Sequence, residues 1–309
     1  MSSIFNRVNN DLRYPILEVS TSEIDQEPLG TKEKFWYKKN GQSFLFKRSR
    51  EGTGEHWAEK AACELASLLN LPCASYDLAI WEGKQGVVTI NFANDCALAH
   101  GNELLARLPE YEKVKDKKYN QPLYTLNRVI AFLDKLGNDK SFRSTVNSLN
   151  ALDIFSGYLL FDAWISNQDR HHENWGCLWT NDSLNQTLAP SYDHAASLGS
   201  FETDDSKHER LHTSSPQRGV EAFVRKAQSA FYREKESGRM GTIEAFEVIS
   251  QKAPFGSVYW RKKLELLTDK NIEDVFRKFG QNVMSDISID FALEMLRLNK
   301  KRILGCGFQ

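Results

Sequence analysis

The stretch of the chain with the most chemically active side chains runs from Asn167 to Asn174 and reads NQDRHHEN. It holds a carboxylate, Asp169, and an amide, Asn174, that are five residues apart. Another carboxylate, Asp193, follows in the segment APSYD. Carboxylate and amide oxygens are ligands for a hard cation such as Mg²⁺, and a carboxylate can also orient an attacking hydroxyl. These residue types therefore indicate phosphoryl transfer as one chemistry for the stretch.

The spacing of these residues is that of a kinase catalytic loop. In protein kinases a base Asp precedes a magnesium-binding Asn by five residues, and another magnesium-binding Asp comes later in the chain. Asp169 and Asn174 have the same separation, and the strand-like runs CLWT and QTLAP predict a hairpin before Asp193. The histidine follows the Asp here instead of preceding it, so the spacing alone leaves the role of the loop open.

A cation for the phosphate groups is predicted upstream. Lys47 ends the apolar run FLF, as the lysine of the V-A-I-K strand does in kinases, where a helix glutamate steadies it. Glu55 and Glu59 are four residues apart on the next predicted helix and therefore share one face. We prefer Glu59 as the partner of Lys47, because it lies one turn inside the helix.

Two further segments are expected to contact a nucleotide. Gly30 to Lys34 (GTKEK) precede the first strand-like run, where backbone amides and the Thr31 hydroxyl could meet phosphate. A hinge that holds adenine through its backbone groups is expected where the fourth strand leaves the small lobe, at Thr89, Ile90, Asn91 and Phe92.

Two other interpretations compete for the NQDRHHEN stretch. It could be only a charged helix end, where Arg and His meet the helix dipole favourably. It could also be a zinc site made by Asp169, His171, His172 and His194. Adjacent histidines point in different directions, and the chain has no H-E-x-x-H motif, so the zinc site is the weaker interpretation.

The pattern of strands and helices predicts an α+β protein with two lobes. Strand-like runs begin at Lys34 and Ser43 on either side of Asn40-Gly41, a strong hairpin signal. A helix at 55–71 and two more strands, at 74–81 and 86–93, complete a small lobe. Residues 150–166 are apolar nearly all round, which indicates a buried helix.

We expect three parts along the chain. An irregular arm is predicted at residues 1–28, a small lobe with the nucleotide-binding loop and lysine at 29–96, and a mainly helical lobe at 97–309. Helical patterns near the C-terminus cover 220–234, 242–251, 271–283 and 290–303.

Composition limits the class of protein. The 309 residues carry 40 Lys and Arg against 41 Asp and Glu, and this near-neutral charge gives no general reason to expect nucleic acid as a partner. The five cysteines are scattered, which argues against a disulfide framework and fits a reducing cytosol. No segment approaches the ~20 apolar residues that span a bilayer, so a cytoplasmic protein without a membrane partner is expected.

The chain resembles the HipA-like serine/threonine kinases. The catalytic segment of that family reads approximately N-x-D-R-H-x-x-N and is followed by A-P-x-Y-D, and both patterns occur here in order, at 167–174 and 189–193. Full-length HipA proteins carry an additional N-terminal subdomain, whereas only about 28 residues precede the predicted nucleotide-binding loop (Gly30 to Lys34) here. The chain therefore looks like the short branch that includes the HipT toxins.

The resemblance implies a kinase-like fold, ATP and Mg²⁺ as cofactors, and a role for each matched residue. Asp169 is implied to be the catalytic base, and Asn174 and Asp193 the metal ligands. Four positions are implied to face the nucleotide: Gly30, Lys34, Lys47 and His171. Family members phosphorylate proteins and often modify a Ser or Thr near the glycine-rich loop, where Ser20, Thr21, Ser22 and Thr31 are the candidates.

The resemblance also implies partners. Toxin members phosphorylate aminoacyl-tRNA synthetases, and antitoxins of HipS or HipB type restrain them. Three alternatives stay open: a catalytically silent nucleotide-binding module, a secreted effector kinase, and a lipid kinase of the same fold.

Overall fold

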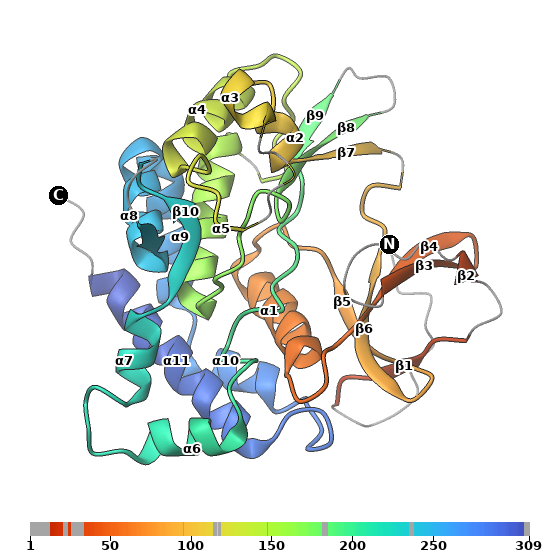
Figure 1. Cartoon of the computed structure of the whole chain (residues 1–309), viewed down its shortest axis with the longest axis vertical. Coiled ribbons are helices and arrows are strands. Elements are labelled where there is room, and N and C mark those ends of the chain that lie inside the picture. The colour runs from red at the N-terminus through yellow and green to blue at the C-terminus, as the bar shows by residue number, and fades with distance from the viewer. Residues whose placement is uncertain are drawn as a thin grey trace.

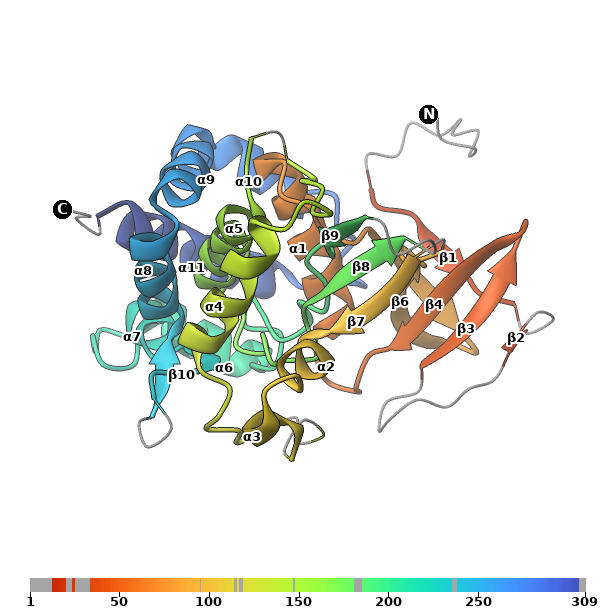
Figure 2. The same ribbon diagram turned by 90° about the horizontal axis from the view of Figure 1, so that it is seen from above.

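The computed structural model describes residues 13–20, 24–25, 34–94, 96–113, 116, 119–146, 148–180, 185–234 and 238–305. In this part of the chain a lobe of strands lies beside a larger, mainly helical lobe (Figure 1). The view from above shows the same separation, with the strands of the small lobe on one side and the C-terminal helices on the other (Figure 2). The predicted α+β fold with two lobes is confirmed.

The small lobe is built on a six-stranded sheet with the order β1-β5-β6-β4-β3-β2 among the described residues. All neighbouring strands are antiparallel except β1 and β5, which are parallel. The strands are β1 (Ile16–Glu18), β2 (Ile24–Asp25), β3 (Lys34–Lys39), β4 (Gln42–Arg48), β5 (Tyr76–Trp81) and β6 (Lys84–Ile90).

Two tight turns fix the register of this sheet. Asn40 and Gly41 join β3 to β4, and both have positive φ angles, of 52° and 77°. Glu82 and Gly83 join β5 to β6 in the same way, with φ angles of 50° and 74°. Two-residue turns with positive φ at both positions match the twist of the strands they join. The hairpin predicted from Asn40-Gly41 is therefore confirmed.

The N-terminal arm differs from its prediction. Residues 1–28 were expected to be irregular, but β1 pairs with β5, and β2 pairs with β3. Tyr14 also donates a backbone hydrogen bond of 2.8 Å to the carbonyl of Lys278 in the helical lobe. Such three- and two-residue strands carry too little periodicity to be recognised in a sequence, and only the neighbouring strand determines them.

The helical lobe begins with a three-stranded sheet of order β7-β8-β9 and then adds helices. A helix between the small-lobe strands, α1 (Glu55–Leu69), packs against both β5 and the helical lobe. None of the described helices is long and apolar enough to cross a membrane. The elements after β6 are β7 (Cys96–His100), α2 (Gly101–Leu105), α3 (Pro109–Glu112), α4 (Leu126–Gly137), α5 (Ala151–Ile165), β8 (Gly176–Thr180), β9 (Gln186–Leu188), α6 (Asp204–His212), α7 (Val220–Arg225), β10 (Gln228–Tyr232), β11 (Arg239–Gly241), α8 (Thr242–Lys252), α9 (Pro254–Leu266), α10 (Asp269–Phe276) and α11 (Asp286–Gly305).

Two predictions in this lobe were wrong in detail. The helical pattern at 220–234 contains α7 and then a strand, β10, which pairs with β11. The lobe predicted to be mainly helical from residue 97 also includes β7, which runs to His100 and pairs with β8, the first strand of the predicted hairpin. The turn of that hairpin, at Asn181-Asp182, lies outside the described residues.

The central helix of the large lobe is α5, and all fifteen of its residues are buried. The Asn150 side chain caps its start by accepting a hydrogen bond from the amide of Asp153 at 2.8 Å. Helix α5 packs on α4, α8, α9 and α11, which explains why it is apolar on every face. It ends at Ser166, which has a φ of 54°, and the NQDRHHEN loop follows directly.

Close packing of α5 on α9 gives a test of this core. A methyl group at Gly157 would lie 2.5 Å from the Trp260 ring and 2.8 Å from Leu71. We expect Gly157→Ala to lower the free energy of unfolding by about 1–3 kcal/mol, because the core cannot take up an extra methyl without moving. Urea unfolding followed by tryptophan fluorescence measures the change.

Gly305→Ala is the matched control, because a methyl group there meets no described atom within 4 Å. This variant should stay within about 0.5 kcal/mol of the wild type. If Gly157→Ala unfolds at the same urea concentration as Gly305→Ala, the packing described for α5 is incorrect.

Candidate active site

A cavity of about 1050 Å³ lies between the two lobes. Its walls come from β3, β4 and β6 of the small lobe and from α2 and the loops around β8 and β9 of the large lobe. Eight of the predicted site residues line it: Lys34, Lys47, Thr89, Ile90, Asn91, Phe92, Asn174 and Asp193. Sequence positions that are up to about 160 residues apart therefore meet at one cavity, which is large enough for a nucleotide-sized ligand.

The alternation of β4 places Lys47 in this cavity. Phe46 is fully buried in the apolar cluster on one face of the sheet, so its neighbour Lys47 lies on the opposite face. Lys34 is the direct cross-strand partner of Lys47 on β3, and both line the cavity. Like charges directly opposite each other are unfavourable, and an anion between the two lysines would remove that cost.

Lys47 joins the lobes through two carboxylates. Its ammonium nitrogen lies 2.8 Å from Asp193 Oδ1 and 3.7 Å from Glu59 Oε2. Glu59, on α1, is the glutamate at Lys47, whereas Glu55 accepts a hydrogen bond from the amide of Arg50. Burial would lower the pKa of Lys47, but the charges of Asp193 and Glu59 raise it well above its ordinary value. The lysine is therefore held charged.

Glu59 is held in its ionised form by the groups around it. Burial would raise the pKa of Glu59, but Lys47 and the hydrogen bonding of His194 lower it below its ordinary value. The His194 amide donates a 2.8 Å hydrogen bond to Glu59 Oε1. Glu59 therefore positions both Lys47 and the backbone directly after Asp193.

Asp169 and Asn174 lie in one compact loop after α5. The Asn174 side-chain amide donates a hydrogen bond of 2.7 Å to the carbonyl of Asp169. The Asp169 amide in turn donates to the side chain of Asn167 at 3.2 Å. The loop thus uses amide side chains to fix the backbone on both sides of Asp169, whose own side chain remains 30% exposed and accessible to a substrate.

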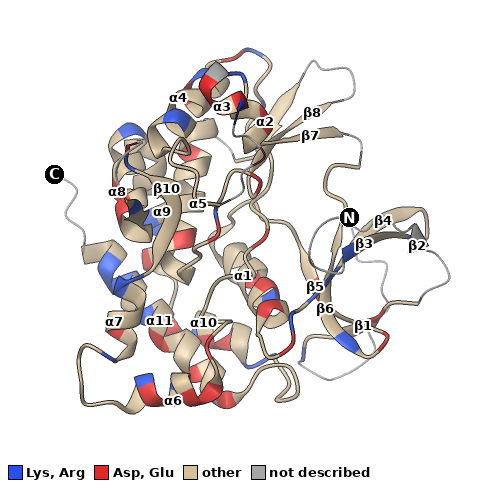
Figure 3. Cartoon of the chain, viewed as in Figure 1, with Lys and Arg blue, Asp and Glu red and all other residues tan. Residues whose placement is uncertain are grey.

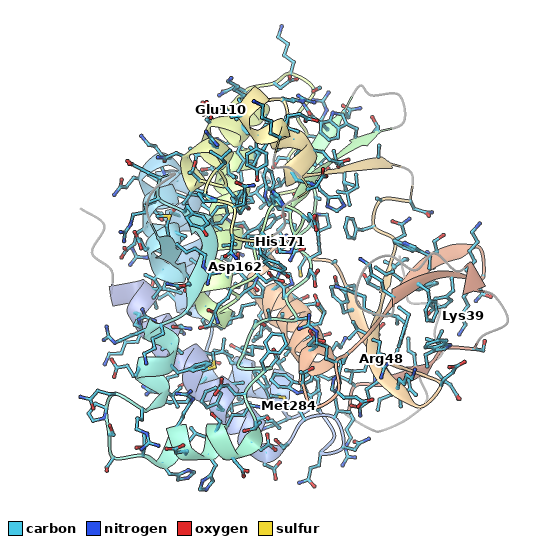
Figure 4. All side chains as sticks on the ribbon, viewed as in Figure 1. Lys39, Arg48, Glu110, Asp162, His171 and Met284 are labelled. Atoms are coloured by element: carbon cyan, nitrogen blue, oxygen red, sulfur yellow. The ribbon has the colours of Figure 1, made fainter. Side chains whose placement is uncertain are left out.

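A buried ion pair anchors this loop to the end of α5. Asp162, in the last turn of α5, pairs with the Arg170 guanidinium through two hydrogen bonds of 2.8 Å. Arg170 also donates to the Asn174 carbonyl at 2.7 Å and to the Ser191 hydroxyl at 2.8 Å. Burial would lower the pKa of Arg170, but Asp162 raises it, so the arginine is charged. Figure 4 shows Asp162 and His171 close to each other near the middle of the molecule.

Asp193 has a left-handed backbone, with a φ of 61°. Asp is one of the few residues with a side chain that adopt this conformation readily. The next residue, His194, is fully buried and lies 2.7 Å from the Ser191 hydroxyl through Nε2. The chain before and after Asp193 is therefore fixed, while the carboxylate reaches into the cavity beside Lys47.

Apolar side chains line part of the cavity next to the predicted hinge. Trp36, Leu45 and Leu98 are among the lining residues together with residues 89–92, and Leu45 pairs with both Trp36 and Thr89. The rings of Phe92 and Tyr192 lie 5.6 Å apart with their planes tilted by 30°. Such side chains suit a flat base, while Lys34 and Lys47, two residues along the same strands, suit phosphate groups.

Three predicted residues lie next to the cavity without lining it: Glu59, Asp169 and His171. The His171 ring is buried, and its Nε2 is 3.8 Å from Asp169 Oδ1. Its Nδ1 accepts a hydrogen bond from the Glu173 amide. His171 thus lies beside Asp169 instead of in the cavity wall, where a nucleotide neighbour was expected. Gly30 and Thr31 lie outside the described residues.

Several site residues were missed in the sequence. The Tyr192 hydroxyl donates to the Glu173 carbonyl at 2.9 Å and lies 2.8 Å from His100 Nδ1, so it joins β7 to the loop. Helix α2 adds Asn102 and Glu103 to the cavity wall. Only Asp162 carried a usable signal, because a carboxylate near the end of a mostly apolar, buried helix needs a charged partner.

The residues at the cavity fit magnesium with a nucleotide and do not fit zinc. Asn174 and Asp193 offer an amide and a carboxylate, and Mg²⁺ is typically bound by one or two such groups together with phosphate oxygens. In the described part of the chain, no three His, Cys, Asp or Glu side chains come together as a metal-binding group. The three histidines of the zinc interpretation are buried, and two of them bind other groups: His172 contacts Tyr111, and His194 contacts Ser191.

The Asp162–Arg170 pair gives a test of how the site is held. Asp162→Asn keeps the shape but leaves the Arg170 charge buried without its counter-ion. We expect it to lower the free energy of unfolding by about 3–5 kcal/mol, which is typical when one partner of a buried pair is removed. Chemical denaturation followed by circular dichroism measures the loss.

Glu294→Gln is the control, because it breaks an exposed ion pair with Arg297. An exposed pair contributes about 1 kcal/mol or less. Equal losses for the two variants would show that the Asp162–Arg170 pair does not support the site.

Comparison with known proteins identifies the family. The HipA-like C-terminal domain matches residues 27–251. Among curated proteins, no sequence matches significantly. The fold is similar to that of the Helicobacter pylori proinflammatory kinase CtkA, with a TM-score of 0.73, 19% identity, and 94% of this chain and 96% of that chain covered. It is also similar to Shewanella oneidensis HipA, from a toxin–antitoxin system and solved with HipB and operator DNA, with a TM-score of 0.58, 12% identity, and 91% of this chain and 65% of that chain covered. The chain belongs to the family of the HipA-like C-terminal domain.

Proposed function

We propose that this protein is an ATP- and Mg²⁺-dependent serine/threonine protein kinase. The family and the fold support a phosphotransferase in general. One observation carries the finer assignment: Lys47, Asn174 and Asp193 line a single cavity, and Asn174 is hydrogen-bonded to the backbone of Asp169. These are the types of group that phosphoryl transfer needs.

Each of these residues has a role in the proposed reaction. Asp169 orients the acceptor hydroxyl and takes its proton. Asn174 and Asp193 would hold Mg²⁺, and Lys47 and Lys34 would bind phosphate oxygens. Bound Mg-ATP supplies the transferable phosphoryl group. The chain contributes orientation and charge, which are the larger part of catalysis in phosphoryl transfer.

The ion pair between Lys47 and Asp193 fits this proposal as a resting arrangement. Lys47 and Asp193 are 2.8 Å apart. A cation bound at Asp193 would take the place of the Lys47 ammonium, and phosphate bound at Lys47 would take the place of the Asp193 carboxylate. Glu59, at 3.7 Å, would then keep Lys47 in place. Lys47 and Asp193 are therefore adjacent, as the phosphate and the cation of one Mg-nucleotide would require.

A narrower role is also proposed, as the toxin kinase of a toxin–antitoxin module in the cytoplasm. The resemblance to the short HipA-like branch supports this role, together with antitoxin partners of HipS or HipB type and an aminoacyl-tRNA synthetase as the target. Of the four candidates for autophosphorylation near the Gly30 loop, only Ser20 belongs to the described residues. Figure 3 shows Lys and Arg positions interspersed with Asp and Glu positions along the described ribbon in this view.

The first alternative, a silent nucleotide-binding module, needs none of the groups that act on an acceptor. Such a module could bind a nucleotide without a base at Asp169. The loop around Asp169 is nevertheless fixed by Asn167 and Asn174 while the carboxylate stays accessible. This organisation favours catalysis.

The test compares phosphate transfer by the wild type, Asp169→Asn and Lys47→Met. We expect Asp169→Asn to lower the transfer rate by about 10²- to 10⁴-fold, the usual effect of losing a general base. Lys47→Met should cost about 10²- to 10³-fold, because a charge aimed at the transition state is lost. Phosphate incorporation into the protein and into casein, measured by mass spectrometry with Mg-ATP, gives the rates.

Asp134→Asn is the control, because Asp134 is exposed on α4, away from the cavity. It should transfer phosphate at the wild-type rate. Transfer by Asp169→Asn at the rate of this control would contradict the role of Asp169, and the absence of any transfer by the wild type would favour the silent module.

A further inference from the structure

Tyr119, which lies between α3 and α4 in the sequence, contacts His171, the neighbour of the proposed base. The Tyr119 ring meets the His171 ring edge-on, with centroids 5.6 Å apart and planes at 79°. His171 Nε2 is in turn 3.8 Å from Asp169 Oδ1. Asp116, three residues before Tyr119, lines the cavity. Tyr119 is therefore separated from the proposed base by one side chain, that of His171, and Asp116 reaches the cavity itself.

The surroundings of this phenol are acidic. Burial raises the pKa of Tyr119, the negative charges of Asp169, Asp193 and Glu173 raise it further, and Arg50 lowers it. The phenol therefore lies within electrostatic reach of the proposed base and of a proposed metal ligand. At 59% exposure, Tyr119 is not a core residue, so its ring is accessible from solvent.

We propose that Tyr119 is a phosphate acceptor of this active site within the same molecule. The inference rests on the proposed kinase function. In the step, the phenol oxygen forms a bond to the γ-phosphorus of ATP while the bond from that phosphorus to the ADP oxygen breaks. The phenol proton passes to the Asp169 carboxylate, and ADP leaves. The products are phosphotyrosine at position 119 and ADP.

Placement explains how a phenol can react in a site proposed for serine and threonine. An acceptor fixed beside its base within one chain has a high effective concentration, so a poorer acceptor can compete with free substrates. His171 supports the ring on one side, and the buried Tyr111–His172 contact of 2.5 Å ties α3 to the same loop. The step should therefore be intramolecular, with a rate that does not depend on protein concentration.

The test uses the full chain incubated with Mg-ATP, at two protein concentrations that differ tenfold. Wild type, Tyr119→Phe and Asp169→Asn are compared by intact mass and by mapping of phosphopeptides, with casein as an external acceptor. Tyr119→Phe keeps the ring on His171 and removes only the hydroxyl. We expect phosphate on Tyr119 of the wild type, at an equal rate at both concentrations. Tyr119→Phe should lack that phosphate and still phosphorylate casein.

The outcomes separate this inference from the proposed function. Phosphate on casein or on other residues with an unmodified Tyr119 overturns the inference and leaves the kinase assignment intact. A rate on Tyr119 that rises tenfold with concentration overturns the intramolecular step. Failure to phosphorylate any acceptor overturns both proposals, because the phosphate would then have no source. Wild-type protein added to Asp169→Asn should leave Tyr119 of the variant unmodified.

Discussion

The buried ion pair between Asp162 and Arg170 is the contact on which both segments of the candidate site depend. Arg170 is almost completely buried, and its donors hold the carboxylate of Asp162, the carbonyl of Asn174 and the hydroxyl of Ser191. One side chain thus fixes the loop after α5 and the segment before Asp193 in a single geometry. A planar guanidinium with several donors can do this, whereas a lysine could not.

Further charged contacts connect these two segments of the site to the small lobe. Lys47 reaches across the cavity to Asp193, and Glu59 holds both Lys47 and the backbone of His194. Charged groups from β4, α1 and two loops are therefore arranged around one cavity before any ligand binds. Apolar residues, among them Trp36, Leu45 and Leu98, line the same cavity.

Sequence patterns predicted the parts of this protein that depend on local chemistry. The Asn40-Gly41 turn, the apolar helix α5 and the spacing from Asp169 to Asn174 all follow from short-range rules. The strands β1, β2 and β10 were missed because their partners are distant in the chain or their residues suit a helix equally well. The position of His171 beside Asp169 depends on the folded loop, which no periodicity encodes. The carboxylate of Asp162 in the apolar helix α5 is explained only by its buried ion pair with Arg170.

In the proposed function, Asn174 and Asp193 hold Mg²⁺ together with a nucleotide bound by Lys47. Calorimetric titration of a non-hydrolysable ATP analogue, with and without Mg²⁺, measures this binding. We expect Mg²⁺ to strengthen binding to the wild type and Asp193→Asn to lose most of this gain while keeping the fold. Binding that is equally strong without Mg²⁺, or a gain unchanged in Asp193→Asn, would contradict it.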